Sequence, residues 1–243
     1  MLRPDLHNLE RKSKMNVLSG GAAAAVVRAV QPEFETRTGQ AIAATFSAVG
    51  MMRDQLVGGA PCDLVILTRP LIAQLIASGH VVPGTERSLG LVKTGVAVRS
   101  GTPHPPVGSR AQLHAAMSAA QGIYFPDPDK ATAGIHFMGV LQALGLDESL
   151  RGKFRVFPNG ATAMGAMAQS QESQLIGCTQ VTEINYTPGV DLVGVLPPEF
   201  ELSTDYTLGI CTHAQHPEQA QLLADLLSGP ASQAVRRQGG FEF

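Results

Sequence analysis

Short β-rich runs alternate with helical patterns along almost the whole chain, and this alternation limits the possible folds more than any other feature. Residues 62–67 are apolar except for Asp63, residues 122–125 form a continuous apolar run, and both segments have strand length. Residues 132–144 have the length and apolar spacing of a helix. Strands that alternate with helices in this way are typical of a mostly parallel sheet with helices on its faces. The sequence therefore predicts an α/β protein.

The same pattern predicts individual elements from residue 15 to residue 237. Pro32 predicts a kink or restart in the first helix, and Gly39 predicts its end. The expected strands are 15–18, 41–46, 62–67, 94–99, 122–125, 155–157, 175–178, 192–195 and 206–211. The expected helices are 22–37, one that follows a turn at Ser47 and ends at Val57, 70–79, 132–144, 161–169 and 217–237, the last broken near residues 229–230.

Two strands flanked by glycines, at residues 94–99 and 204–212, are candidate crossings between two lobes. A chain of 243 residues is long enough for two lobes of ordinary size. We therefore expect lobe 1 to comprise residues 1–93 and 205–243, and lobe 2 to comprise residues 94–204. Each lobe is predicted to hold its own mostly parallel sheet.

The charge content excludes several classes of protein. Only 16% of the residues are charged, the net charge is -2, and Lys and Arg form no cluster of the kind that nucleic-acid grooves need. No apolar run is long enough to cross a bilayer, so we expect no membrane insertion. An anionic ligand would have to be held by local dipoles rather than by a positive surface.

The cysteines give no sign of a metal site or a disulfide framework. Cys62, Cys178 and Cys211 are far apart and odd in number, and none has metal-ligand spacing to the seven histidines. We predict buried structural thiols, no metal and no cofactor.

The N-terminal segment has some features of an export signal. Arg11, Lys12 and Lys14 precede an apolar stretch over residues 17–30, but glycines at 20 and 21 and Arg28 interrupt that stretch. A strand, a glycine turn and a helix fit it better, so we expect no export signal here. A cytoplasmic protein and a trimmed precursor both remain open.

Four strand-to-helix junctions share one chemical design: small residues and a hydroxyl stand where a helix begins. The first amides of a helix have no partner within it, and the helix dipole places partial positive charge there, so an anion can bind. In parallel sheets, ligands bind at this same edge. Helix capping by Ser and Thr is the alternative explanation, and no nucleotide-binding fingerprint is present. The junctions are Ser19-Gly20-Gly21, Ser47-Ala48-Val49-Gly50, Ala131-Thr132-Ala133-Gly134 and Gly160-Ala161-Thr162.

The chain resembles the molybdate-binding proteins of ABC importers, a branch of the type II periplasmic binding proteins. The resemblance covers about residues 15 to 243 in order. It implies two α/β lobes joined by two crossings, a monomer, a periplasmic location and an importer permease as partner. The segments that carry it are LSGGAAAAVVRAVQPEFETRTGQ, TFSAVGMMRDQLVGGAPCDLVIL, VAVRSGTPHP, PDPDKATAGIHFMGVLQALGL, VFPNGATAMGAMAQ and TEINYTPGVDLVGVLP.

The resemblance also assigns ligand-binding residues. Ser19 and Ser47 would bind the ligand from lobe 1, and Thr132 would bind it from lobe 2. Residues 180–183 would add a further contact, and Tyr186 or Tyr206 would supply the tyrosine that the family often uses. The full expected ligand-binding set is Ser19, Gly20, Ser47, Ala48, Arg69, Lys130, Thr132, Ala133, Gly160 and Gln180.

The chain departs from molybdate binders in two ways. Ala48 follows Ser47 where those proteins typically carry a second small hydroxyl residue. Arg69 and Lys130 lie near predicted cleft loops, whereas molybdate sites usually exclude formal charge. Basic residues suit a carboxylate ligand better.

This divergent branch looks like the one that includes aconitate isomerases. Isomerising an allylic carboxylate requires a positioned base, for which His136 and Glu183 are the candidates. The sequence thus predicts a protein that captures a small oxyanion or a di- or tricarboxylate, for ABC-type import. An isomerase of such a carboxylate and a cytoplasmic anion sensor are the alternatives.

Overall fold

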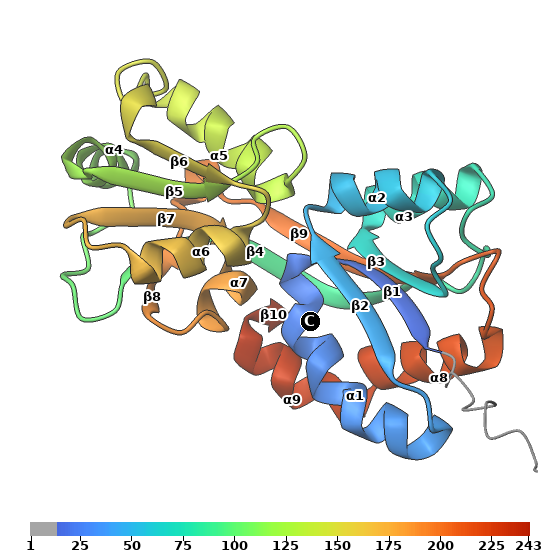
Figure 1. Cartoon of the computed structure of the whole chain (residues 1–243). Coiled ribbons are helices and arrows are strands. Elements are labelled where there is room, and N and C mark those ends of the chain that lie inside the picture. Colours follow the sequence, from blue (N-terminus) through green and yellow to red (C-terminus); the bar gives the residue numbers. More distant parts are fainter. Residues whose placement is uncertain (1–13) are drawn as a thin grey trace, which may run out of the picture.

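The computed structural model describes residues 14–243, which fold into two lobes joined at a narrow waist (Figure 1). The predicted α/β fold is confirmed. Strands β4 (Arg87–Arg99) and β9 (Ser203–Ile210) lie at the waist. Lobe 1 holds β1 (Met15–Gly20), η1 (Gly21–Ala23), α1 (Ala24–Thr38), β2 (Ile42–Ser47), α2 (Val49–Val57), β3 (Leu64–Thr68), α3 (Arg69–Ala77), α8 (Pro217–Ser228), α9 (Pro230–Gly239) and β10 (Phe241–Glu242); lobe 2 holds α4 (Arg110–Ala119), β5 (Gly122–Pro126), α5 (Thr132–Ala143), η2 (Arg151–Lys153), β6 (Phe154–Phe157), α6 (Gly160–Gln169), β7 (Leu175–Gln180), α7 (Val181–Asn185) and β8 (Val190–Val195).

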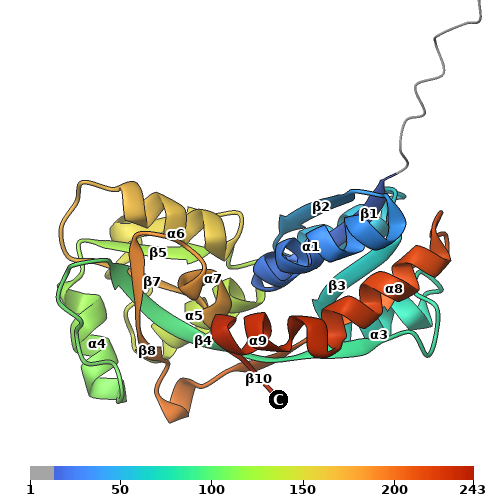
Figure 2. The ribbon, with the colours of Figure 1, turned by 90° about the horizontal axis from the view of Figure 1, so that it is seen from below.

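The strands form one curled mixed sheet with the order β2-β1-β3-β9-β4-β7-β5-β6. In lobe 1 the pairs β1–β2 and β1–β3 are parallel, and in lobe 2 so are β5–β6 and β5–β7. Helices cover both faces of each half, as the view from below also shows (Figure 2). The carboxyl ends of the parallel strands of the two lobes therefore face each other across the waist.

Strand β4 holds the two lobes together. Residues 87–93 of β4 pair with β9 in lobe 1, and residues 94–99 pair with β7 and β8 in lobe 2. The expected strand at 94–99 is therefore only the second half of a longer strand. We expected the return crossing at residues 204–212; the chain comes back from lobe 2 through residues 196–203, which lead directly into β9, and β9 pairs with β3 and β4.

Each lobe has its own apolar core, and Val181 of α7 in lobe 2 also joins the core of lobe 1. One buried cluster is built from segments at both ends of the chain, including Phe34, Leu64 and Leu223. Two further clusters lie on opposite faces of the lobe 2 sheet, because alternate residues of one strand point to opposite faces: Phe125 belongs to one and Tyr124 to the other. These clusters support our proposal that residues 1–93 with 205–243, and residues 94–204, form the two lobes.

Most of the other predicted elements are present, and the differences lie in helices. The first helix begins as a 3₁₀ turn at Gly21–Ala23, and α1 then runs through Pro32 without a restart and ends where Gly39 adopts φ 70°. Helix α4 was not expected, although the Ser109 side chain caps it by accepting a hydrogen bond from the Gln112 amide at 3.3 Å. The short helix α7 was also missed. The three cysteines are free and buried, as predicted.

Helix α5 begins at the waist because Gly134 lets it pack directly on the strand-end loop. A Cβ at position 134 would lie 2.2 Å from the Pro126 carbonyl oxygen and 2.3 Å from that of Asp127. Backbone atoms cannot move aside at low cost. This glycine therefore fixes the place of the α5 N-terminus.

We predict that Gly134→Ala lowers the free energy of unfolding by about 1–3 kcal/mol, since it overpacks a fixed backbone contact. Gly139→Ala in the same helix is the matched control, because nothing lies within 4 Å of its Cβ position. The control should stabilise the fold by about 0.5–1 kcal/mol. Urea unfolding of both variants measures the difference; equal effects would contradict this account of Gly134.

Candidate functional site

A narrow cleft lies between the lobes. Both lobes contribute to it from the carboxyl ends of their parallel strands. The expected residues Ser47, Ala48, Thr132, Ala133, Gly160, Gln180 and Glu183 all line it, together with Gly21, Val49, Pro126, Ala131, Asn159 and Tyr206.

The starts of four helical segments converge on this cleft. Gly21 begins the 3₁₀ turn that leads into α1, Val49 begins α2, Thr132 begins α5 and Gly160 begins α6. Each start presents amides that have no partner inside the helix, at the positive end of the helix dipole. The cleft thus has a field that favours anions without a single cationic side chain among its lining residues.

Ser47 and Thr132 line the cleft from opposite lobes. The capping position of α2 is Ala48 and that of α5 is Ala131, and neither helix has a side-chain cap. The capping explanation therefore fails at these two junctions. Within residues 14–243 neither hydroxyl has a hydrogen-bond partner, so both can donate to a ligand.

The carboxyl group of Glu183 is the one acidic group in the lining. Glu183 lies in α7 and is only 7% exposed. Its Oε2 accepts a hydrogen bond from the Thr179 hydroxyl at 2.5 Å, and the backbone of Gly160, Ala161 and Gln180 favours the ionised form of the carboxyl group. Glu183 therefore binds to the N-terminus of α6 from within the protein.

Two glycines allow Glu183 to occupy this position. A Cβ at Gly160 would lie 2.0 Å from Oε2 of Glu183, and a Cβ at Gly21 would lie 2.1 Å from Oε1. Gly160 belongs to lobe 2 and Gly21 to lobe 1. The carboxyl group thus fills the space between the two lobes at the edge of the cleft.

Burial controls the protonation of the two titratable groups in the lining. Desolvation raises the pKa of Glu183 above its ordinary value, against the opposing effect of its hydrogen bonds from Thr179 and the backbone. Desolvation, and then the negative charge of Glu183, raise the pKa of Tyr206 far above its ordinary value. Tyr206 therefore remains a neutral phenol, and Glu183 holds a proton more tightly than an exposed carboxyl group does.

The side chain of Gln180 has an unused acceptor at the cleft. Gln180 is 2% exposed, and its Oε1 has no hydrogen-bond partner. Its Nε2 lies 3.5 Å from the Thr204 hydroxyl. Because buried polar atoms are normally satisfied, this amide marks a place for a polar group of a ligand.

Four of the expected ligand-binding residues do not line the cleft. Ser19 is fully buried and donates to the Gly20 carbonyl at 2.8 Å; Gly20 itself packs towards Val49 and Tyr206. The Arg69 side chain points to the surface and pairs with Asp205 at 2.7 Å. Ser19, Gly20 and Arg69 therefore lie outside the lining of the cleft.

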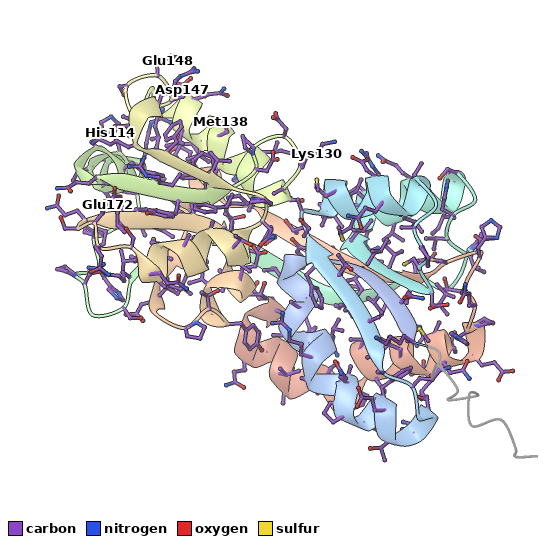
Figure 3. The ribbon with its side chains drawn as sticks, viewed as in Figure 1. His114, Lys130, Met138, Asp147, Glu148 and Glu172 are labelled. Carbon is purple, nitrogen blue, oxygen red and sulfur yellow. The ribbon has the colours of Figure 1, made fainter. Side chains whose placement is uncertain are left out.

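Lys130 instead joins the lobes beside the cleft. It lies on the loop of lobe 2 nearest to α2 (Figure 3), where its Nζ pairs with Asp54 Oδ2 at 2.8 Å. Its carbonyl accepts a hydrogen bond from the Gly50 amide at 3.1 Å. Lys130 also lowers the pKa of Asp54. The lysine charge is therefore neutralised across the waist rather than offered to a ligand.

The two candidate bases lie in different places. Only Glu183 lines the cleft. His136 lies on the side of α5 away from it, where its Nε2 donates to the Phe200 carbonyl at 2.7 Å. A pattern of helical spacing could not show which side of α5 this residue takes.

Sequence reasoning left several lining residues unassigned. Tyr206 rather than Tyr186 reaches the cleft; Tyr186 donates to the Val235 carbonyl at 2.5 Å. Asn159 caps α6 by accepting from the Thr162 amide at 2.8 Å, a signal that the sequence does contain. Gly21, Val49 and Ala131 belong to the predicted strand-to-helix junctions but not to the expected ligand-binding set, and Pro126 belongs to neither.

The fold and the cleft define the class of protein. Residues 15–242 match the family model of the bacterial extracellular solute-binding proteins, and the chain belongs to that family. Within the described residues no helix is long and apolar enough to cross a membrane, and no group of three His, Cys, Asp or Glu side chains could hold a metal ion.

Among characterised relatives, the chain is 30% identical over 234 residues to an aconitate isomerase of a Pseudomonas species. This match covers 93% of the chain and 86% of the relative. The fold is similar to that of the periplasmic molybdate-binding protein of Azotobacter vinelandii, with a TM-score of 0.78, 17% identity and coverage of 95% and 99%. It is also similar to a sulfate-binding protein of Mycobacterium tuberculosis H37Rv, with a TM-score of 0.72, 16% identity and coverage of 94% and 86%. The resemblance to type II periplasmic binding proteins is thereby confirmed.

The raised pKa of Glu183 predicts a pH-dependent stability. Above about pH 4.3 the unfolded chain releases this proton, while the folded protein retains it up to its own higher pKa. The unfolding free energy of the wild type should therefore fall relative to that of Glu183→Gln as pH rises through this window, by at most about 1.4 kcal/mol per pH unit. Urea unfolding at a series of pH values measures it. A difference that is constant or grows with pH would contradict the assignment.

Proposed function

We propose that this protein binds a small di- or tricarboxylate anion in the interlobe cleft. The observation that carries the proposal is the lining itself: helix N-termini and two free hydroxyls attract an anion, while one protonatable carboxyl group faces the same space. Helix N-termini and hydroxyls suit any small oxyanion. The carboxyl group of Glu183 narrows the range of anions that the cleft can bind.

Glu183 favours a carboxylate over a tetrahedral oxyanion. An ionised Glu183 would repel a compact dianion held only a few ångströms away. A protonated Glu183 can instead donate a charge-assisted hydrogen bond to one carboxylate group of a longer ligand. The name of the 30% identical relative points to the same class of ligand. Arg69 and Lys130 supply no positive charge to the cleft lining, since each is paired with an aspartate outside it.

Membership of the solute-binding family supports a role for this protein in solute import. The solute-binding family is described as extracellular. A periplasmic monomer that delivers its ligand to an ABC-type permease would fit this membership. Ligand capture between two lobes joined by β4 would then proceed by a hinge motion at the waist.

The first test of the proposal removes a hydroxyl from each lobe. Ser47→Ala and Thr132→Ala should each weaken trans-aconitate or citrate binding at least tenfold, since a hydrogen bond to a charged group contributes about 1.5–3 kcal/mol. Neither variant should lose stability, because neither side chain caps its helix. Calorimetric titration and thermal unfolding of the same samples measure both quantities.

Ser109→Ala is the matched control, because that serine caps α4 far from the cleft. It should cost about 1 kcal/mol of stability and leave the affinity unchanged. The proposal would be wrong if neither acid bound to the wild type while neutral sugars or amines did.

Isomerisation of an unsaturated carboxylate is the second candidate function. The position of Glu183 favours it, since a base must reach the carbon acid directly. The ionised carboxylate would remove a proton from the carbon next to the double bond, and the electron pair would spread over the allylic system. The protonated Glu183 would then return that proton to the far carbon, so that the double bond moves. The converging helix N-termini would stabilise the negative charge that develops in between.

We predict that trans-aconitate incubated with the wild type yields the cis isomer, detected by proton NMR. Glu183→Gln should abolish turnover, because an amide cannot accept the proton. His136→Ala is the control and should retain full turnover, since His136 lies outside the cleft. Tight binding without conversion over hours would exclude the isomerase and leave the binding protein.

A further inference from the structure

The N-terminus of α6 differs from the other helix starts at the cleft because neighbouring side chains already lie against it. The Thr162 amide donates to Asn159 Oδ1, and the Ala163 amide donates to the Asn159 carbonyl. The carboxyl group of Glu183 lies beside Gly160, and the backbone of Gly160 and Ala161 favours its ionised form. The first turn of α6 is therefore occupied by side chains of the protein itself. Glu183 thus stands where an oxygen of an anionic ligand would bind.

We infer that Glu183 is the specificity-determining residue of the cleft: it acts as a built-in anion that excludes fully ionised tetrahedral oxyanions and admits a carboxylate together with one proton. This inference rests on the proposed function, that the cleft binds small anions. It adds that Glu183 selects among small anions and that this selection depends on pH.

The carboxyl group cannot move away to make room. The Thr179 hydroxyl holds Oε2 at 2.5 Å, and the side chain is 7% exposed. Gly160 lies against one oxygen and Gly21 of the opposite lobe lies against the other, each so close that a Cβ would collide. A ligand therefore meets Glu183 as a fixed part of the wall.

The groups that face Glu183 offer no charge that could offset a second anion. The facing residues are Gly21 from η1, Gly160 from α6, Thr179 and Gln180 from β7, and Tyr206 from β9. Tyr206 is the single titratable group among them, and its strongly raised pKa keeps it neutral. Two ionised groups would then share one desolvated site, so one proton must bind to Glu183 when the ligand enters.

The unpaired Oε1 of Gln180 also favours a ligand that carries a proton over a fully ionised oxyanion. Its Oε1 is buried and has no partner beside the carboxyl group. A tetrahedral oxyanion without protons cannot donate to it, whereas a ligand hydroxyl or a protonated carboxyl group can. The polar lining thus selects against fully ionised acceptors at two neighbouring residues.

The decisive experiment vacates the α6 site and uses sulfate as the probe. Glu183→Ala frees the Thr179 hydroxyl and uncovers the backbone of Gly160, Ala161 and Gln180. Calorimetric titration at pH 7.5 should show sulfate affinity at least tenfold higher than in the wild type. Glu183→Gln removes the charge without opening the site, so it should show a smaller gain. If both variants bind sulfate no better than the wild type, the inference is overturned.

Circular dichroism and thermal unfolding verify that both variants are folded. If Glu183→Ala does not fold, the sulfate affinity of Glu183→Gln still tests the inference, since any increase in that variant must come from the loss of the negative charge. Asn159→Ala serves as the comparison variant, because it frees one α6 amide but leaves the carboxylate in place. It should not gain sulfate affinity.

The second arm measures trans-aconitate affinity between pH 6 and pH 9, with the wild type and Glu183→Gln side by side. Wild-type affinity should fall with rising pH, by up to tenfold per unit once Glu183 is ionised in the free protein, and the variant should show a flat profile. A flat wild-type profile, or equal slopes in both proteins, would overturn the inference. Failure of trans-aconitate to bind at any pH would refute the proposed function, and the sulfate arm would still decide the role of Glu183.

Discussion

The structure depends on one continuous strand that belongs to both lobes. The hydrogen bonds of β4 pass from β9 to β7 and β8 between Lys93 and Thr94, so the two half-sheets share a backbone and cannot separate. This strand fixes where the carboxyl ends of the parallel strands meet. All the chemistry of the cleft, including the convergence of helix starts, follows from that meeting.

Because the lining contains no cation, backbone dipoles must supply its positive potential. The ligand-free cleft carries only a small free-energy cost, since its amides can form hydrogen bonds to water. Placing one buried carboxyl group into this field has two effects. The amides partly offset the desolvation of Glu183, and Glu183 in turn takes up part of the potential that a ligand would otherwise use.

The sequence predicts the parts that depend on local chemistry. Strand and helix alternation locates most elements, and small residues at 47–48 and 131–133 correctly mark helix starts at the cleft. The predictions from sequence that failed concern the direction in which a side chain points. Spacing does not tell whether Lys130 turns towards the ligand or towards Asp54, and it does not tell which side of α5 carries His136. The position of Glu183 depends on Gly21 in the other lobe, a contact made only by folding.

Lobe 1 and lobe 2 also differ in how the chain builds them. The core of lobe 2 comes from one uninterrupted stretch, whereas the core of lobe 1 joins Phe34 and Leu64 to Leu223 and Phe241 near the other end of the chain. During synthesis, the first 90 residues must therefore wait for the last 40 before their sheet gains β9 and β10. Lobe 2 can assemble earlier, and the unfinished lobe 1 remains open.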